Sequence, residues 1–155
     1  MKKKYLFITS LLFVFANCNA QEQNTSVKSL LNRTETSIYK GQKQLIAGAL
    51  PKSTTELVLA VKYQVLAVEA FKANDPKSAV CYSLKAREYT NELFTKIQMN
   101  NSYFLLNEDE VKLAAEKNYS SSDESYKTKI TADPIEESVL LDPQRLGISY
   151  KISTN

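Results

Sequence analysis

The chain has 155 residues, with 20 lysines and arginines against 17 aspartates and glutamates, and it contains no histidine. A chain of this length forms one domain with a modest core. The missing histidine excludes the usual general base, the Ser-His-Asp and Cys-His catalytic arrangements and the commonest metal ligand. Three glycines in the whole chain leave no phosphate-binding loop, so we predict no catalytic site, no cofactor and no metal.

Residues 1–20 have the three-part pattern of an export signal. Lys2, Lys3 and Lys4 form a basic start, a largely apolar run extends from residue 5 to 16, and small residues stand at Cys18 and Ala20 before Gln21. The apolar run is too short for a membrane-spanning helix. We therefore predict a signal peptide cleaved after Ala20 and a mature protein in the periplasm or outside a bacterial cell.

Cys18 leaves an alternative open. Phe15-Ala16-Asn17-Cys18 resembles a degraded lipobox, the signal of bacterial lipoproteins, in which the cysteine becomes the lipidated first residue. That family has Gly, Ala or Ser where Asn17 stands, so we prefer cleavage after Ala20 over an envelope lipoprotein anchored through Cys18. Cleavage there leaves Cys81 as the only cysteine, which we interpret as a small core residue rather than part of a disulfide framework.

Loss of the signal changes the charge balance. It removes three lysines and no acid, so the 20 basic residues become 17 and match the 17 acidic ones. A neutral mature chain has no electrostatic footprint for nucleic acid or for an anionic membrane surface. We therefore expect a protein partner of unknown identity and no nucleic acid.

After a polar leader, residues 21–25, a first helix is predicted over residues 26–48. Residues of its apolar seam recur at spacings of four and three, a period typical of one helix face; they are Val27, Leu31, Thr34, Ile38, Gly41 and Leu45. Gly41 is expected to weaken this helix. Gly48, followed by Pro51, ends it.

A helical hairpin is predicted over residues 53–73 and 76–98. Ser53 and Glu56 have the spacing of a capping box, and Asp75 followed by Pro76 is a second helix start. The short turn between the helices permits only an antiparallel pair. Small residues are expected to form the close contact between its arms; they are Ala67, Ala70, Ala79, Ser83 and Ala86.

Tyr63, Leu66, Ala67 and Ala70, followed by Ala79, Ser83 and Ala86, have the spacing of the tetratricopeptide-repeat signature. The hairpin resembles a single repeat of that family over residues 63–91, with departures where Ala70 and Ser83 replace aromatic residues and Asn91 replaces a terminal proline. No second copy is found, and stacked arrays need about three units. Any close-packed helix pair with alanines at the contact is the rival interpretation.

A fourth helix is predicted over residues 108–119. Asn107 and Glu110 form a capping box, and Val111, Ala114 and Ala115 are expected to face inward. The apolar run 103–106 before it is expected to be buried.

Residues 120–155 are predicted to be a polar linker and tail. The segments 126–131 and 148–153 alternate with period two, a strand-like pattern, and they either pair as a small ribbon or belong to a mobile tail, which we favour. The predicted domains are thus a signal peptide (1–20), a helical bundle (21–119) and this tail. The fold class is all-α, a small antiparallel bundle of three to four helices with an irregular or short-strand tail.

Two groups of residues are candidates for partner binding. Tyr82 and Tyr89, seven apart on one helix, are expected to share an exposed face. Ile148, Tyr150 and Ile152 give the tail an apolar edge that could add to a partner's sheet or dock on its own bundle. Our first hypothesis is an exported, non-enzymatic protein-interaction module.

The alternative is a hydrolase or small-ligand binder that uses carboxylates in a cleft of the bundle. Its candidates are the runs 108–110 and 136–137, which lack the spacing of a calcium loop. The first run is also explained by the helix dipole, since acids stabilise a helix start. A deep pocket with two facing carboxylates would favour this alternative.

Overall fold

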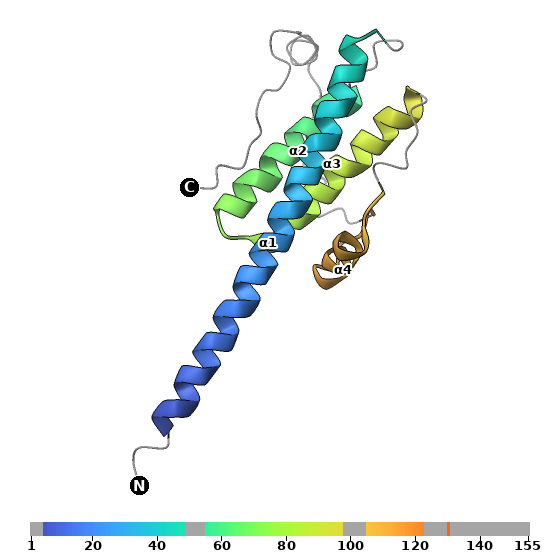
Figure 1. Ribbon diagram of the computed structural model, residues 1–155. Coiled ribbons are helices and arrows are strands. Elements are labelled where there is room, and N and C mark those ends of the chain that lie inside the picture. The colour runs from blue at the N-terminus through green and yellow to red at the C-terminus, as the bar shows by residue number, and fades with distance from the viewer. Residues whose placement is uncertain (1–4, 49–54, 98–104, 123–129, 131–155) are drawn as a thin grey trace.

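Four helices make up the part of the chain that the computed structural model describes, residues 5–48, 55–97, 105–122 and 130. No strand occurs among these residues, so the all-α prediction is confirmed for them (Figure 1). The helices are α1 (Tyr5–Ile46), α2 (Thr55–Lys72), α3 (Pro76–Lys96) and α4 (Glu108–Glu116). Side chains of α1 are described at Glu22 and from Asn24 onward.

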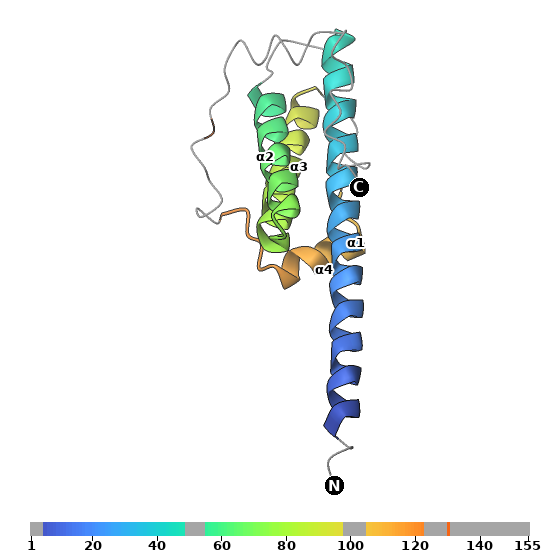
Figure 2. The same ribbon diagram turned by 90° about the vertical axis from the view of Figure 1, so that its left-hand side faces the viewer.

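The hairpin of α2 and α3 is the centre of the bundle. The two helices run antiparallel, α1 lies along them, and α4 packs against α1 and α3 (Figures 1 and 2). The N-terminal part of α1 projects beyond the other helices in both views.

Local signals fix the turn of this hairpin. Asn74 has φ 59°, and the backbone N–H of Asp75 donates to Ala70 O at 2.9 Å while that of Asn74 donates to Phe71 O at 3.0 Å. This is a Schellman ending of α2. Asp75 Oδ1 then accepts from the Ser78 N–H at 3.1 Å, and Pro76 takes the first helical position. The predicted antiparallel hairpin is confirmed.

The small residues of the hairpin are buried, as expected for a close contact. Ala67, Ala79, Ser83 and Ala86 have no exposed surface, whereas Ala70, next to the turn, is only half-buried. Cys81 is also completely buried, which agrees with its prediction as a core residue.

The apolar core consists of two clusters with a polar layer between them along the helices. Phe94, Leu93 and Leu57 belong to one cluster, and Leu30 and Leu31 belong to the other. Fully or almost fully buried polar side chains occupy the intermediate positions of α1, α2 and α3; they are Thr34, Gln64, Ser83 and Arg87.

The start of α1 differs from the prediction. Residues 21–25, predicted as a polar leader, are helical, and α1 begins at Tyr5 rather than near Ser26. No glycine or proline interrupts residues 5–40, and the Ser26 hydroxyl donates to Glu22 O at 3.2 Å within the helix instead of capping a new one. The end of α1 agrees better, since Gly48 has φ 84° just past its last turn.

The start of α2 is shifted in a smaller way. The helix begins at Thr55, and Ser53 lies outside the described residues, so the predicted capping box is not tested. The Glu56 carboxylate forms an ion pair with Lys96 at the end of α3.

The inward face of α4 was predicted wrongly at Val111 and Ala115, whereas Ala114 packs against the cluster of Leu30 and Leu31 as predicted. Val111 is 53% exposed and Ala115 is exposed, whereas Glu110 and Leu113 are buried and Ala114 is half-buried. The reason is electrostatic, because Glu110 turns toward arginines of α1 and α3 and sets the rotation of the helix. The helix also ends at Glu116, before a Schellman turn with Asn118 at φ 54°.

The apolar run before α4 is not buried as a whole. Leu105 is 68% exposed and Leu106 is half-buried, while residues 103 and 104 lie outside the described part. Of the tail, only Ile130 is described beyond residue 122, and it packs against the cluster that contains Phe94. The two strand-like segments therefore remain predictions. Among the described residues, no helix combines the length and apolar character needed to cross a membrane.

Candidate functional site

A chain of buried polar contacts joins α1, α2 and α3. Gln64 Nε2 donates to the Leu31 carbonyl oxygen at 2.9 Å. The Ser83 hydroxyl oxygen lies 3.2 Å from Gln64 Oε1 and 3.0 Å from Thr34 Oγ1, so its single hydrogen serves one of them at a time. Buried polar groups that lack partners are costly, and these contacts therefore fix how the three helices align.

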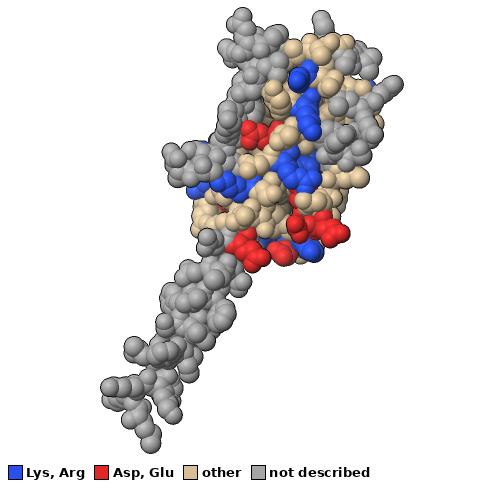
Figure 3. Space-filling view, in the orientation of Figure 1, with Lys and Arg blue, Asp and Glu red and all other residues tan. Residues whose placement is uncertain are grey.

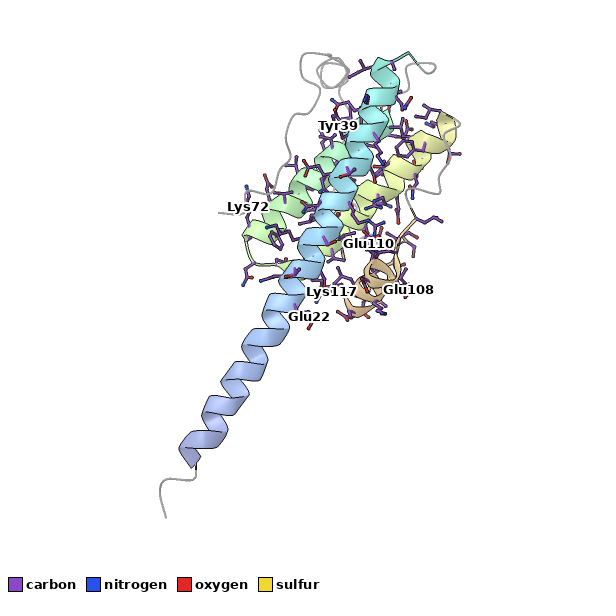
Figure 4. The ribbon with its side chains drawn as sticks, in the orientation of Figure 1. Glu22, Tyr39, Lys72, Glu108, Glu110 and Lys117 are labelled. Atoms are coloured by element: carbon purple, nitrogen blue, oxygen red, sulfur yellow. The ribbon has the colours of Figure 1, made fainter. Side chains whose placement is uncertain are left out.

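The same chain continues to α4 through two arginines. Arg87 donates from Nη2 to Thr34 Oγ1 at 3.1 Å, and this nitrogen lies 3.5 Å from Glu110 Oε1. Arg33 Nη1 lies 3.3 Å from Glu110 Oε2. Figure 4 shows Glu110 on the bundle side of α4 and Glu108 away from it.

This ion pair is largely removed from water. The side chains of Arg87 and Glu110 are 3% and 5% exposed, whereas that of Arg33 is 36% exposed. Burial lowers the pKa of Arg87, and the nearby Arg33 lowers it further, while the charge of Glu110 opposes both. Glu110 is therefore the counter-ion that allows two guanidinium groups to lie near each other.

Glu110 also completes the predicted capping box of α4. Its backbone N–H donates to Asn107 Oδ1 at 2.8 Å, and the Asn107 N–H donates back to Glu110 Oε2 at 3.0 Å. The start of α4 and its attachment to the bundle thus depend on one carboxylate. In Figure 3, basic side chains follow the visible face of α1, and acidic ones gather where α4 meets it.

Tyr82 and Tyr89 contact the same residue of α2, but both are half-buried, whereas an exposed face was predicted. Both pack on the buried Tyr63 of α2, with ring centroids 6.3 Å and 5.6 Å away, and the Tyr89 ring is stacked on it. Lys85 Nζ lies 5.6 Å from the centre of the Tyr89 ring. We call the surface of Tyr63, Tyr82 and Tyr89 the tyrosine face.

The residues after α4 are attached to α3 beside this face. The Tyr119 hydroxyl donates to Glu88 Oε1 at 2.6 Å, and Lys85 Nζ donates to Glu88 Oε2 at 2.6 Å and to Ser121 O at 3.4 Å. Burial raises the pKa of Tyr119, and its hydrogen bond to Glu88 raises it further. Ile130 reaches the hydrophobic cluster against which Tyr82 and Tyr89 also pack.

A cavity of about 230 Å³ lies between α1 and α4, lined in part by Ser26, Ser29 and Asp109. Glu110 also borders it, but its carboxylate is engaged by Arg33 and Asn107. Asp109 and Glu110 are neighbours on one helix and do not face each other across the cavity. In the described part of the chain, no three His, Cys, Asp or Glu side chains are grouped to hold a metal ion.

The remaining predicted site residues are not described. Ile148, Tyr150 and Ile152 lie outside the described residues. Cys18 belongs to α1, where only its backbone is described. Sequence reasoning missed Arg87, although an arginine four residues after Ser83, on the small-residue face of the hairpin, is a signal of a buried charge. Comparison with protein-family models, with curated proteins and with solved structures returned no match.

Proposed function

We propose that this chain is an exported, non-enzymatic helical protein that binds another protein through the tyrosine face. The observation that carries the proposal is Ile130, which is remote in sequence and packs against the cluster that Tyr82 and Tyr89 border. The hydrophobic cluster that the tyrosine face borders thus accepts an aliphatic side chain from a residue beyond the four helices. Tyrosine combines an apolar ring with a hydroxyl group that can stay in contact with water, and it is enriched at protein interfaces. The partner we propose presents a branched aliphatic residue in an extended segment.

Export is supported by how the N-terminal pattern relates to the bundle. The buried side chains that the structure describes begin at Val27, and the N-terminal part of α1 projects beyond the other helices (Figure 2). Cleavage after Ala20 would therefore remove residues of this projecting part of α1. The neutral charge of the resulting chain argues for a protein partner rather than nucleic acid.

The proposal that the protein is not an enzyme is supported by the contacts of its buried carboxylates, which form ion pairs between helices. Glu56 pairs with Lys96 between α2 and α3, and Glu110 pairs with Arg33 and Arg87 between α4 and the bundle. These groups hold helices together. The resemblance of residues 63–91 to one tetratricopeptide-repeat unit belongs to the same proposal, although the binding surfaces of that family are formed by stacked repeats and the chain has one such unit.

Site-specific photo-crosslinking in the cells that export the protein tests this function. A photoreactive amino acid replaces Tyr82 or Tyr89 in turn, and Tyr39 serves as the matched control because it is a tyrosine on α1 that is 41% exposed. We expect one heterologous adduct of defined mass from positions 82 and 89 and none from position 39.

The purified Tyr89→Ala variant should then fail to capture that partner while its circular dichroism stays helical. Equal adducts from all three positions, or an unchanged capture by the variant, would contradict the proposal.

A further inference from the structure

We call the surface of α1 and α3 that α4 covers the groove; it is formed by Arg33, Arg87, Leu30, Leu31 and Val80. These residues have the chemistry of a receptor for a helix. We infer that α4 is a resident ligand of this groove, and that the groove binds a helix of a partner protein that carries a glutamate and, three residues later, a leucine. This site lies under α4 between α1 and α3, apart from the tyrosine face, and the inference does not depend on the proposed function there.

The floor of the groove selects a carboxylate. Arg87 is 3% exposed and is fixed by its hydrogen bond to Thr34, and Arg33 stands at the rim. Without Glu110, both guanidinium groups would lose the carboxylate that pairs with them here. A buried ion pair contributes little net stability compared with apolar packing, and its best-attested role is to specify which segment binds and in which register.

The wall of the groove selects an apolar side chain one helical turn away. Of the α4 residues, Glu110 and Leu113 are buried, at 4% each, and Leu113 joins the cluster of Leu30, Leu31 and Val80. Residues three apart lie on the same helix face, so the two contacts together recognise a helix in one orientation. A polar cap three residues before the glutamate, as Asn107 supplies here, would start such a helix.

The fit of α4 leaves room for a better ligand. Glu110 Oε1 is buried, lies 3.5 Å from Arg87 Nη2 and has no hydrogen-bond partner among the described contacts. Charge-assisted hydrogen bonds between arginine and carboxylate are usually about 2.7–2.9 Å long. In addition, α4 has only nine residues, and helices of that length are marginal without docking. A longer partner helix could displace it.

Fluorescence anisotropy with a labelled synthetic peptide of residues 105–119 tests this inference on the full-length chain. In the wild-type chain the resident α4 competes with the peptide. The Asn107→Ala/Leu113→Ala variant weakens α4 but keeps its carboxylate, and it should bind the peptide about tenfold more tightly. The matched control Lys112→Gln, at a side chain that is 71% exposed, should bind it as the wild type does.

Two further variants identify the recognised group. A peptide with Glu110→Gln should bind the double variant about tenfold more weakly, and so should the normal peptide when Arg33→Gln is added to that variant. If circular dichroism shows that the double variant is unfolded, the Glu110→Gln chain replaces it.

We call the Asn107→Ala/Leu113→Ala variant and its replacement Glu110→Gln the loosened chains. Equal peptide binding by the wild-type chain and the loosened chains would overturn the inference. So would binding that does not respond to the peptide's glutamate, or sedimentation showing that the loosened chains exchange α4 as dimers. None of these results involves the tyrosine face, so the crosslinking outcome stands separately.

Discussion

Gly41 shows how much one residue contributes to the contact between α1 and α3. It is buried, and a Cβ added there would lie 2.9 Å from Leu93 Cδ2 and 3.5 Å from Phe94 Cζ. Both neighbours are completely buried and have little freedom to move. The glycine that was expected to weaken the first helix therefore allows that helix to approach the hairpin closely.

Gly41→Ala should lower the free energy of unfolding. Overpacking of a filled core costs about 1–3 kcal/mol, and the better helix propensity of alanine offsets about 1 kcal/mol of it. We expect a net loss of about 1 kcal/mol in urea unfolding, whereas the exposed neighbour Lys40→Ala should change stability by less than about 0.5 kcal/mol. A stabilised Gly41→Ala chain would show that the contact relaxes freely.

Tyr119 makes the stability of the folded protein depend on pH in the alkaline range. Because burial and Glu88 raise its pKa above the ordinary value of 10.0, the folded state holds the proton more tightly than the unfolded state does. Its stabilising contribution is therefore complete below pH 10 and is lost as the pH rises above that value.

Spectrophotometric titration of the tyrosines, together with urea unfolding at several alkaline pH values, checks this dependence. One late-titrating tyrosine should disappear in Tyr119→Phe, and the loss of stability above about pH 10 should become shallower. The variant should also lose about 1–2 kcal/mol at neutral pH, because it lacks the hydrogen bond to a charged group. An unchanged alkaline profile would assign the effect to another residue, such as Tyr89, whose pKa burial also raises.

Helix ends were predictable where the signal is local. Asp75 with Pro76, and Asn107 with Glu110, act within four residues of each other, and both caps are present. The face of α4 was not predictable in the same way, because it depends on Arg33 and Arg87, which lie far away in sequence. The start of α1 was missed for a different reason, since its apolar run and its amphipathic seam are both compatible with one continuous helix.

Asp75 permits a test of the cap of α3. The hydrogen bonds from Ser78 lower its pKa, so the cap stabilises the helix above the ordinary value of 3.8 and loses its effect as the pH falls through the lowered value. Asp75→Asn should keep most of the stability at neutral pH, since asparagine caps about as well, and should remove this acid dependence.

Asp75→Ala removes the capping side chain altogether and is the comparison for Asp75→Asn. It should lower the free energy of unfolding by about 1 kcal/mol at neutral pH. Thermal unfolding at neutral and acidic pH distinguishes the two variants. If Asp75→Ala were as stable as the wild type, the bond to Ser78 would contribute nothing to the helix.

At the scale of the molecule, the described residues form two apolar clusters separated by one polar layer. This division limited what the sequence could reveal about the candidate site. The pairing of Tyr82 with Tyr89 follows from helical spacing alone. The spacing of Arg87 after Ser83 indicates that it is buried, but it does not identify its partner. The contact of Arg87 with Thr34, and that of the two tyrosines with Tyr63, depend on the packing of separate helices, which spacing along one helix does not predict.

The position of the buried residues predicts how far the N-terminus can be shortened. A chain that starts at Gln21 should melt within about 2 °C of the full-length chain, because residues 5–20, which it lacks, belong to the part of α1 that projects beyond the other helices.

A chain that starts at Asn32 lacks Val27, Leu30 and Leu31, and it should melt at least about 10 °C lower, since each buried side chain contributes about 1.5–3 kcal/mol. Far-ultraviolet circular dichroism during heating measures both chains. A large loss from the first truncation would mean that residues 1–20 are part of the folded domain.

Cys81 has no exposed surface in the middle of α3, and after cleavage at Ala20 it would be the only thiol in the chain. An aromatic disulfide reagent can therefore react with the mature protein only when α3 separates from its neighbours. The rate of this reaction would therefore report how often α3 opens, and the protein would need no added label. In an oxidising compartment the exposed Cys81 thiolate of an opened molecule would attack a disulfide of another molecule, forming a mixed disulfide and releasing a thiolate. Molecules that open often would therefore be trapped before they refold, whereas the burial of Cys81 protects those that stay closed.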